Sequence, residues 1–304
     1  MKAVVTGGAG FIGSNLVDQL IDDGHEVFVV DDLSSGNVSN INPKAHFDGP
    51  YDISDTHLAV PQNFLSSADV IFHLAARARV QPSIEDPIHF NETNVTGMLC
   101  LLKTAVDNKI KRFIYSSSSS VYGNVDHTPT DEKHKLNPMS PYGAQKLIGE
   151  IYCRQFYQTY GLESTCLRYF NVYGERQLLE GAYSLVMGKF AQQRLNGESM
   201  TIRGDGEQRR DFTYVGDVVK ANILSAMSNL PEATKGTPIN IGSGDNRSVN
   251  QIADMIGGPR IHDDPVIEPR ESLADNSLAA FLLWWKPTGN IENWVEGYKK
   301  DLGL

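Results

Sequence analysis

Cysteine is scarce in this chain of 304 residues, and long apolar runs are missing from it. The three cysteines, Cys100, Cys153 and Cys166, are an odd number and lack the close spacing of metal ligands. No stretch approaches the roughly 20 apolar residues that span a bilayer. Met1-Lys2 leads straight into a short strand pattern instead of a secretory leader. We therefore expect a cytoplasmic protein with reduced thiols, no bound metal and no membrane contact.

Positive charge is also in short supply. Lysine and arginine number 27 against 37 aspartates and glutamates, so the formal net charge is −10. This balance argues against nucleic acid as a partner. It still permits a small anionic substrate, because such a molecule needs only a few well-placed arginines.

The first half of the chain alternates short apolar strands with longer helical patterns. This alternation predicts an α/β fold of Rossmann type, in which helices cover both faces of a doubly wound parallel sheet. We expect residues 1–173, with parts of 210–245, to form this domain and residues 174–304 to form mostly a smaller lobe. The expected strands are 2–6, 26–31, 69–73, 112–116 and 164–169, and the expected helices are 11–23, part of 91–108, 141–160, 185–196 and 215–229.

Three glycines mark the turn between the first strand and the first helix. The spacing of Gly7, Gly10 and Gly13 suits a tight turn, a close approach to a pyrophosphate and close packing of helix on strand. The helix N-terminus would offer free N–H groups to the phosphates. Asp31 ends the second strand, where a carboxylate accepts hydrogen bonds from ribose hydroxyls and repels a 2′-phosphate. The pattern predicts NAD as the cofactor.

Tyr142 and Lys146 stand four residues apart, so both lie on one face of the helix that Pro141 begins and Ser140 caps. A free tyrosine has a pKa of about 10, too high for a base at neutral pH. A nearby ammonium and an oxidised nicotinamide ring would both lower that pKa. The pair therefore predicts a tyrosine base supported by a lysine.

Taken in order, these motifs resemble the extended short-chain dehydrogenase/reductase family and, within it, the UDP-hexose 4-epimerases. The resemblance covers nearly the whole chain, and it implies an NAD-dependent isomerase that forms a homodimer through the helices near 91–108 and 142–160. It rests on residues 6–13, 73–76, 94–97, 116–123, 140–146, 167–174, 210–215 and 272–275.

The resemblance implies catalytic roles for Ser118, Tyr142 and Lys146, with the Ser118 hydroxyl bonded to substrate and to Tyr142. Because strand side chains alternate, Ser116, Ser118 and Ser120 of the five-serine run would share a face. Asp52 resembles an adenine contact, and the alternative for it is a loop acid that caps a helix. The implied NAD site comprises Gly7, Gly10, Phe11, Ile12, Gly13, Asp31, Asp32, Asp52, Ile53, Leu74, Ala75, Ala76, Asn94, Ser116, Tyr142, Lys146 and Tyr169.

The substrate site is implied by fewer residues. Asn171, Arg210 and Arg270 resemble contacts to the nucleotide diphosphate, for which a guanidinium fork is suited, and the alternative for each arginine is a surface ion pair. Ser272 resembles the position beside the sugar, where a small side chain leaves room for an N-acetyl group. The family's usual loop between Glu271 and Ser272 is missing here, which affects the expected lid and Arg270.

The implied reaction inverts C4 of UDP-glucose or UDP-galactose, and of their N-acetylated counterparts. Tyr142 takes the proton of the 4-hydroxyl, the hydride on C4 passes to NAD, and after the 4-keto sugar turns over the hydride returns to the opposite face. Sugar 4,6-dehydratases need an Asp-Glu pair where Ser119 and Ser120 stand, and none of the cysteines matches a GDP-sugar 3,5-epimerase/reductase motif.

Two alternatives remain open. UDP-glucuronate 4-epimerisation or decarboxylation fits if Arg77 or Arg79, at positions usually uncharged in the family, binds a carboxylate; otherwise these arginines face solvent. A non-catalytic NAD-binding regulator is the more remote alternative, because it has no use for a serine, a tyrosine and a lysine in this combination.

Overall fold

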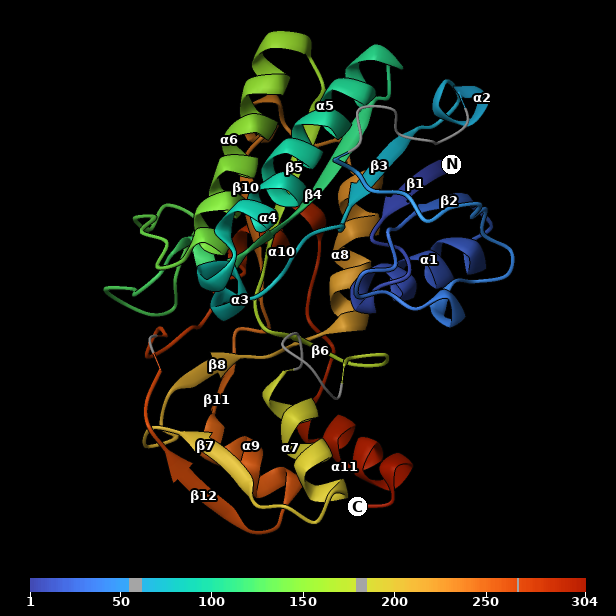
Figure 1. Ribbon diagram of the computed structural model, residues 1–304. Helices are drawn as coiled ribbons and strands as arrows, with labels where there is room; N and C mark the ends of the chain where they lie inside the picture. The colour runs from blue at the N-terminus through green and yellow to red at the C-terminus, as the bar shows by residue number, and fades with distance from the viewer. Residues whose placement is uncertain (55–61, 179–184, 267) are drawn as a thin grey trace.

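A six-stranded parallel sheet forms the centre of the computed structural model, which describes residues 1–54, 62–178, 185–266 and 268–304 (Figure 1). The strand order is β10-β5-β4-β3-β1-β2. The predicted α/β Rossmann fold is thereby confirmed. The strands are β1 (Lys2–Thr6), β2 (Glu26–Val30), β3 (Val70–His73), β4 (Arg112–Ser118), β5 (Glu163–Tyr169) and β10 (Pro238–Ile241).

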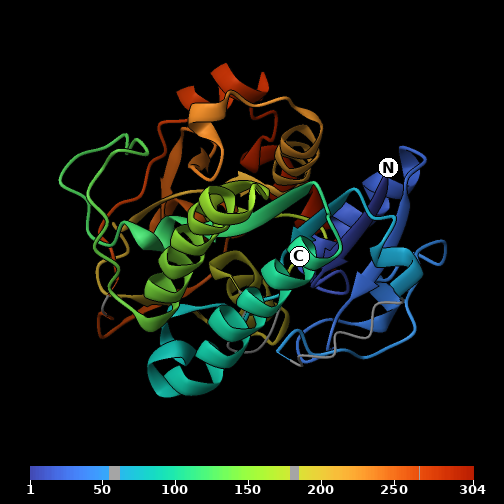
Figure 2. The same ribbon diagram turned by 90° about the horizontal axis from the view of Figure 1, so that it is seen from above.

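Helices cover both faces of the sheet, as Figure 2 shows from above. On one face, α1 (Phe11–Asp22) and α8 (Val215–Met227) pack on the strands and form a buried apolar cluster with them. Residues of α10 (Ser277–Leu283) belong to the same cluster. On the other face, α5 (Met98–Asp107) and α6 (Pro141–Tyr160) bury a second cluster. Strands covered on both sides are mostly apolar, and this explains why the apolar runs of β1, β2 and β3 can be identified in the sequence.

The order of the strands reverses beside β1, since the chain goes from β1 outward to β2 and then returns to β3 on the other side. Open α/β sheets bind ligands at such a switch point, outside the carboxyl ends of the strands. The glycine loop that follows β1 and the segment that follows β3 both lie at this edge. The fold therefore brings the glycine loop and the segment after β3 to the same edge of the sheet.

A smaller lobe lies beyond the carboxyl ends of the strands (Figure 1). Its own buried cluster includes Phe190, Ile202 and Ile252. None of the described helices has the length and apolar composition needed to cross a membrane. The lobe contains α7 (Val186–Leu195), α9 (Val249–Ile256) and α11 (Ile291–Leu302), the strand pairs β7 (Met200–Arg203) with β12 (Arg260–Asp263) and β8 (Arg209–Asp211) with β11 (Asn246–Ser248), and, at its junction with the sheet, β6 (Val172–Tyr173) with β9 (Thr213–Tyr214).

Local signals define α6 as predicted. The Ser140 hydroxyl accepts a hydrogen bond from the Gly143 N–H at 3.2 Å, Pro141 occupies the first turn, and Gly161 ends the helix with a φ of 72°.

The conformation of the five-serine run differs from the predicted continuous strand. Strand β4 ends at Ser118 and a 3₁₀ turn follows, so Ser120 does not share a strand face with it.

Candidate active site

The three predicted catalytic residues lie together at the carboxyl end of β4. The Ser118 hydroxyl lies near enough to Tyr142 to lower the pKa of its phenol, and it accepts from the Ser120 N–H at 3.2 Å and from Ser120 Oγ at 2.9 Å. The Lys146 ammonium donates to the backbone carbonyl of Ser116 at 2.8 Å, and its nitrogen lies 5.9 Å from the centre of the Tyr142 ring. The end of β4 and the first two turns of α6 therefore fix the tyrosine, the lysine and the serine relative to one another.

Burial changes the acidity of the tyrosine and the lysine. It raises the pKa of Tyr142, while the hydrogen bond from Ser118 and the charge of Arg79 oppose that rise. It lowers the pKa of Lys146 to about 7, against the opposing effect of Glu150. Near neutral pH the lysine is therefore present in both its charged and its neutral form.

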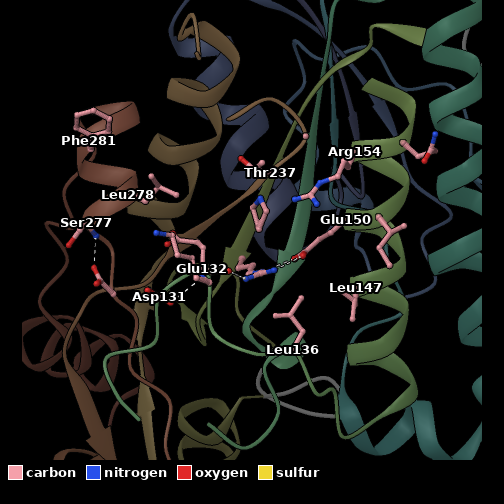
Figure 3. Close-up of a pocket in the computed structure, with 17 residues that line it drawn as sticks. Asp131, Glu132, Leu136, Leu147, Glu150, Arg154, Thr237, Ser277, Leu278 and Phe281 are labelled. Atoms are coloured by element: carbon pink, nitrogen blue, oxygen red, sulfur yellow. Dashed lines mark hydrogen bonds and ion pairs between the residues drawn. The ribbon is translucent and has the colours of Figure 1, made fainter. Parts of the chain in front are cut away.

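A buried ion pair lies behind Lys146, and no sequence motif pointed to it. Glu150, one turn further along α6, accepts from Nε and Nη2 of Arg168 at 2.8 and 2.7 Å, and Oε1 also accepts from Ser117 Oγ at 2.6 Å. Ser117 and Ser118 thus point to opposite faces of β4. Glu150 and Arg168 line a cavity of about 750 Å³ along α6 and α10, and none of the predicted site residues lines it. Figure 3 shows this cavity with Glu150 labelled.

The glycine loop has the shape that a dinucleotide requires. Gly7 has a φ of 72°, and a Cβ added there would lie 2.7 Å from the Ala75 nitrogen. A Cβ at Gly13 would lie 2.0 Å from the Gly7 carbonyl oxygen, whereas one at Gly10 would meet only that oxygen, at 3.2 Å. The loop is therefore closed toward the protein and open on its outer side. There α1 begins at Phe11 and presents unpaired N–H groups to a pyrophosphate.

The two aspartates at the end of β2 have different surroundings. Asp31 is buried, and its carboxylate accepts from the backbone N–H groups of Ala9 at 2.9 Å and Leu33 at 2.8 Å. Asp32 accepts from Arg77 Nη2 at 3.3 Å. Asp31 therefore braces the glycine loop in addition to its predicted contact with the ribose, and Asp32 holds the Arg77 side chain.

The segment after β3 is fixed to the loop and to the catalytic helix. His73 Nδ1 is hydrogen-bonded to Thr6 Oγ1 at 2.8 Å, and Ala75 N–H donates to the same oxygen at 3.2 Å. Asn94 accepts from the Arg77 N–H at 2.9 Å and donates to the Arg77 carbonyl at 2.9 Å. These bonds hold the predicted residue Ala75 against the end of β1 and the predicted residue Asn94 against Arg77.

Among the other predicted cofactor residues, Ser116, Tyr169 and Ile53 are buried, whereas Asp52 lies in an exposed turn. The hydroxyls of Ser116 and Tyr169 are hydrogen-bonded at 3.0 Å and buried beneath Lys146. Ile53 is buried against Gly97. Asp52 accepts from the backbone N–H and hydroxyl of Ser54, both at 2.8 Å, so it closes its own turn and caps no described helix. No group of acidic, histidine or cysteine side chains within the described residues could hold a metal ion.

The predicted substrate residues are only partly brought together. Asn171 Nδ2 donates to Ser272 Oγ at 3.3 Å, so these two residues are in contact. Arg210 is paired with Glu268 at 2.6 Å, and Arg270 makes two bonds to Asp205, at 2.8 and 3.0 Å. The Arg270 side chain is 64% exposed. It therefore lies at the protein surface and is not part of the group formed by Asn171 and Ser272.

The path of the shortened connection explains where Arg270 lies. Arg209 N–H donates to the Arg270 carbonyl at 2.9 Å, and Ser272 N–H donates to the Arg209 carbonyl at 3.0 Å, so the segment runs along β8. The fully buried Asp211, which sequence reasoning missed, accepts from the N–H groups of Ser243 at 2.7 Å and Ala274 at 3.0 Å. The Asp211 carboxylate thereby fixes the segment that follows Ser272.

Comparison with known proteins identifies the family. Residues 3–242 match the model of the NAD-dependent epimerase/dehydratase family. A putative UDP-glucose 4-epimerase of Methanocaldococcus jannaschii is 40% identical, over 98% of this chain and 96% of its own. A UDP-N-acetylglucosamine 4-epimerase of Methanobrevibacter ruminantium, solved with UDP-N-acetylmuramic acid, is 39% identical with a TM-score of 0.90, over 98% of this chain and 97% of its own.

A second similar structure contains both the cofactor and a substrate. It is a UDP-glucuronic acid 4-epimerase of Bacillus cereus in complex with UDP-glucuronic acid and NAD, 31% identical with a TM-score of 0.90, over 100% of this chain and 99% of its own. The matches extend over both lobes, and the glycine loop described above fits the same dinucleotide. The chain belongs to the NAD-dependent epimerase/dehydratase family, and the three similar proteins named above are described as UDP-sugar 4-epimerases, one of them putatively.

Proposed function

We propose that the protein is an NAD-dependent 4-epimerase of UDP-hexoses. The observation that carries this proposal is the group formed by Ser118, Tyr142 and Lys146 beside a glycine loop shaped for NAD. A protein that only binds NAD has no need of a phenol, a hydroxyl and an amine held together at the carboxyl end of β4.

Each side chain has a task in this proposal. The Tyr142 phenolate accepts the proton of the sugar 4-hydroxyl and returns it to the 4-oxygen of the product, while Ser118 donates a hydrogen bond to that oxygen. NAD, when bound, takes the hydride from C4 and gives it back to the other face. Asn171 and Arg210 hold the diphosphate and leave the sugar free to turn over. Lys146 adds positive charge beneath Tyr142.

Ser272 supports a sugar pocket open enough for an N-acetyl group. Its hydroxyl accepts from Asn171 Nδ2 and from the Asp211 N–H, each at 3.3 Å, so the short side chain is held toward the protein. We therefore propose UDP-N-acetylglucosamine and UDP-N-acetylgalactosamine as substrates beside UDP-glucose and UDP-galactose. The similarity to the Methanobrevibacter ruminantium epimerase agrees with this choice.

UDP-glucuronate is the second candidate substrate, and Arg79 is the observation that favours it. This half-buried arginine lies close enough to Tyr142 for each charge to affect the other. A carboxylate on C5 of the sugar would carry the charge that a guanidinium binds. The Bacillus cereus enzyme shows that a protein of this fold acts on such a substrate.

Incubation with single UDP-sugars tests the proposal. Purified protein is given UDP-glucose, UDP-N-acetylglucosamine or UDP-glucuronate without added reductant, and the products are separated by anion-exchange chromatography. We expect the 4-epimer of both neutral sugars, and none from Tyr142→Phe. Conversion of UDP-glucuronate alone, to its 4-epimer or to a UDP-pentose with loss of carbon dioxide, would favour the second candidate. No conversion of any sugar by NAD-loaded protein would contradict both.

The homodimer and the cytoplasmic location remain predictions. Helices α5 and α6 lie side by side on one face of the sheet (Figures 1 and 2). They carry the exposed apolar side chains of Leu99 and Ile151. We propose that the two helices of one subunit pack against those of the other. Sedimentation of the wild type against Ile151→Glu, which we expect to be monomeric, tests this arrangement.

A further inference from the structure

The turn that follows β4 brings two serine side chains into contact. Strand β4 ends at Ser118, and a 3₁₀ turn over Ser119–Val121 begins at the next residue. In a continuous strand, residues at i and i+2 have their Cα atoms about 6.6 Å apart and their side chains parallel. The turn brings Ser120 back toward Ser118, and Ser120 Oγ donates to Ser118 Oγ at 2.9 Å. The departure from the predicted strand therefore creates this bond.

The bonds from Ser120 occupy both acceptor positions of the Ser118 hydroxyl. A serine hydroxyl has two lone pairs and one proton. The Ser118 oxygen accepts from the Ser120 N–H at 3.2 Å and from the Ser120 hydroxyl at 2.9 Å, so both lone pairs are engaged. The proton of Ser118 is the group left for a further bond, and it points away from Ser120.

The Tyr142 phenol lies within the influence of the Ser118 hydroxyl. Ser118 lowers the pKa of this phenol, which is the effect of a hydrogen-bond donor on a group that becomes negatively charged. A hydroxyl whose oxygen accepts a hydrogen bond is itself a stronger donor, because the bonds of a chain polarise one another. The bond from Ser120 therefore both directs and strengthens the donation by Ser118.

The backbone of the turn is fixed against the start of α6. Gly143, the residue after Tyr142, approaches the Ser120 carbonyl oxygen so closely that an added Cβ would lie 2.7 Å from it. The Ser119 carbonyl accepts from the Tyr122 N–H at 3.1 Å and closes the turn. Ser120 is therefore held in one place relative to the tyrosine.

We propose that Ser120 is a positioning residue, which directs the proton of Ser118 toward Tyr142 and the 4-oxygen of the sugar. The inference rests on the proposed function, in which Ser118 donates to the oxygen that loses and regains its proton. It requires no particular sugar. Ser120 acts only through Ser118 and needs no contact with the substrate.

A double-mutant cycle of Ser118→Ala and Ser120→Ala tests the proposal. With a UDP-sugar that is converted, we expect Ser120→Ala to lower kcat about three- to tenfold and to leave KM nearly unchanged, because one hydrogen bond of the chain is lost. In a protein that already carries Ser118→Ala, the same change should have no further effect on kcat. A further loss in the double variant would overturn the proposal, since Ser120 would then act independently of Ser118.

Two single variants serve as controls. Ser120→Thr keeps the hydroxyl and should retain the kcat of wild type. Ser119→Ala removes a hydroxyl from the same turn, to which Ser119 contributes its carbonyl, and should also retain it. Equal losses of kcat in Ser119→Ala and Ser120→Ala would show a general disturbance of the turn and would overturn the proposal.

Titration of the Tyr142 phenol in the NAD-bound protein needs no sugar. The phenolate absorbance of each variant is measured against the same variant carrying Tyr142→Phe, so that only Tyr142 contributes to the difference. Ser120→Ala should raise the midpoint when Ser118 is present and leave it unchanged in Ser118→Ala. Lys146, whose nitrogen lies 5.9 Å from the centre of the Tyr142 ring, is the same in all these proteins, so its effect cancels.

The titration separates this inference from the proposed function. A midpoint that depends on Ser120 only when Ser118 is present, in a protein that converts no UDP-sugar, would contradict the proposed function and support the role of Ser120. Conversion of a UDP-sugar with the same kcat and the same midpoint in wild type and Ser120→Ala would do the reverse.

Discussion

Arg168 and Glu150 form a two-pronged ion pair inside the protein, with nitrogen–oxygen distances of 2.8 and 2.7 Å. Both side chains are almost completely removed from solvent. The Tyr122 hydroxyl accepts a further bond from Arg168 Nη1 at 2.8 Å, so the arginine is bonded on two sides. The pair connects β5 to α6 one turn beyond Lys146.

Removal of one partner should be strongly destabilising. Arg168→Met leaves the Glu150 carboxylate buried without its main partner, and we expect a loss of about 3–5 kcal/mol in the free energy of unfolding. Urea denaturation measures this loss. The double variant Arg168→Met/Glu150→Leu should recover a large part of it, because no charge then remains buried. Equal stability of Arg168→Met and wild type would contradict the prediction.

His73 should make the stability depend on pH. Burial, and then the charge of Lys146, lower its pKa from 6.5 to about 3. As the pH falls below 6.5, the unfolded chain takes up the proton before the folded protein does, so stability is lost toward pH 3. Between neutral pH and pH 5 we expect wild type to lose about 2 kcal/mol more than His73→Asn.

His73→Asn is suitable for comparison because its amide can still bond to Thr6 Oγ1, as His73 Nδ1 does at 2.8 Å. Denaturation curves at several pH values give the two slopes. If the free energies of unfolding of both proteins fall equally as the pH is lowered, protonation of His73 is not the cause of the loss.

Gly13→Ala should weaken NAD binding. The added methyl group would lie 2.0 Å from the Gly7 carbonyl oxygen, so α1 must move away from the loop. Such overpacking costs about 1–3 kcal/mol, and we expect NAD affinity to fall at least about tenfold in calorimetric titration. Gly297→Ala is the matched control, because its methyl group meets nothing within 4 Å and should leave NAD affinity unchanged.

Ser272→Tyr should change the choice of sugar if the proposed function holds. A ring at this position would occupy the space left by the serine and exclude an N-acetyl group. The ratio of kcat/KM for UDP-N-acetylglucosamine to that for UDP-glucose should fall at least about tenfold. Ser272→Ala, which removes the hydroxyl but keeps the side chain small, should preserve the ratio. A preserved ratio in Ser272→Tyr would show that the sugar ring lies elsewhere.

Local signals made much of the fold predictable. The helix at 141–160 has a serine cap, a proline in its first turn and a glycine after its last residue, so its bounds could be predicted before the structure was known. The residue at which β4 ends could not be predicted from such signals. Ser118 is paired with Tyr169, the last residue of β5, and the ladder ends where the neighbouring strand does. The run of five identical serines does not indicate at which residue the strand ends.

The site was predictable where its residues are close in sequence or occur in a recognisable motif. Tyr142 and Lys146 are one helical turn apart, and the three glycines occupy a single loop. Glu150 and Arg168 lie on different elements, and only the packing of α6 against β5 brings them together. The exposed position of Arg270 follows from the pairing of its short segment with β8, which the sequence does not encode locally.

The bonds that Asp31 makes to the protein itself limit how cofactor preference can be redesigned. Replacement of the acid at the end of the second strand is the obvious way to admit a phosphorylated ribose. In this protein the same carboxylate anchors Ala9 and Leu33, so its loss would loosen the loop that has to hold the new cofactor. Asp32 and Arg77 are only partly buried and bonded to each other. A change of preference is therefore better sought at that pair, with Asp31 left in place.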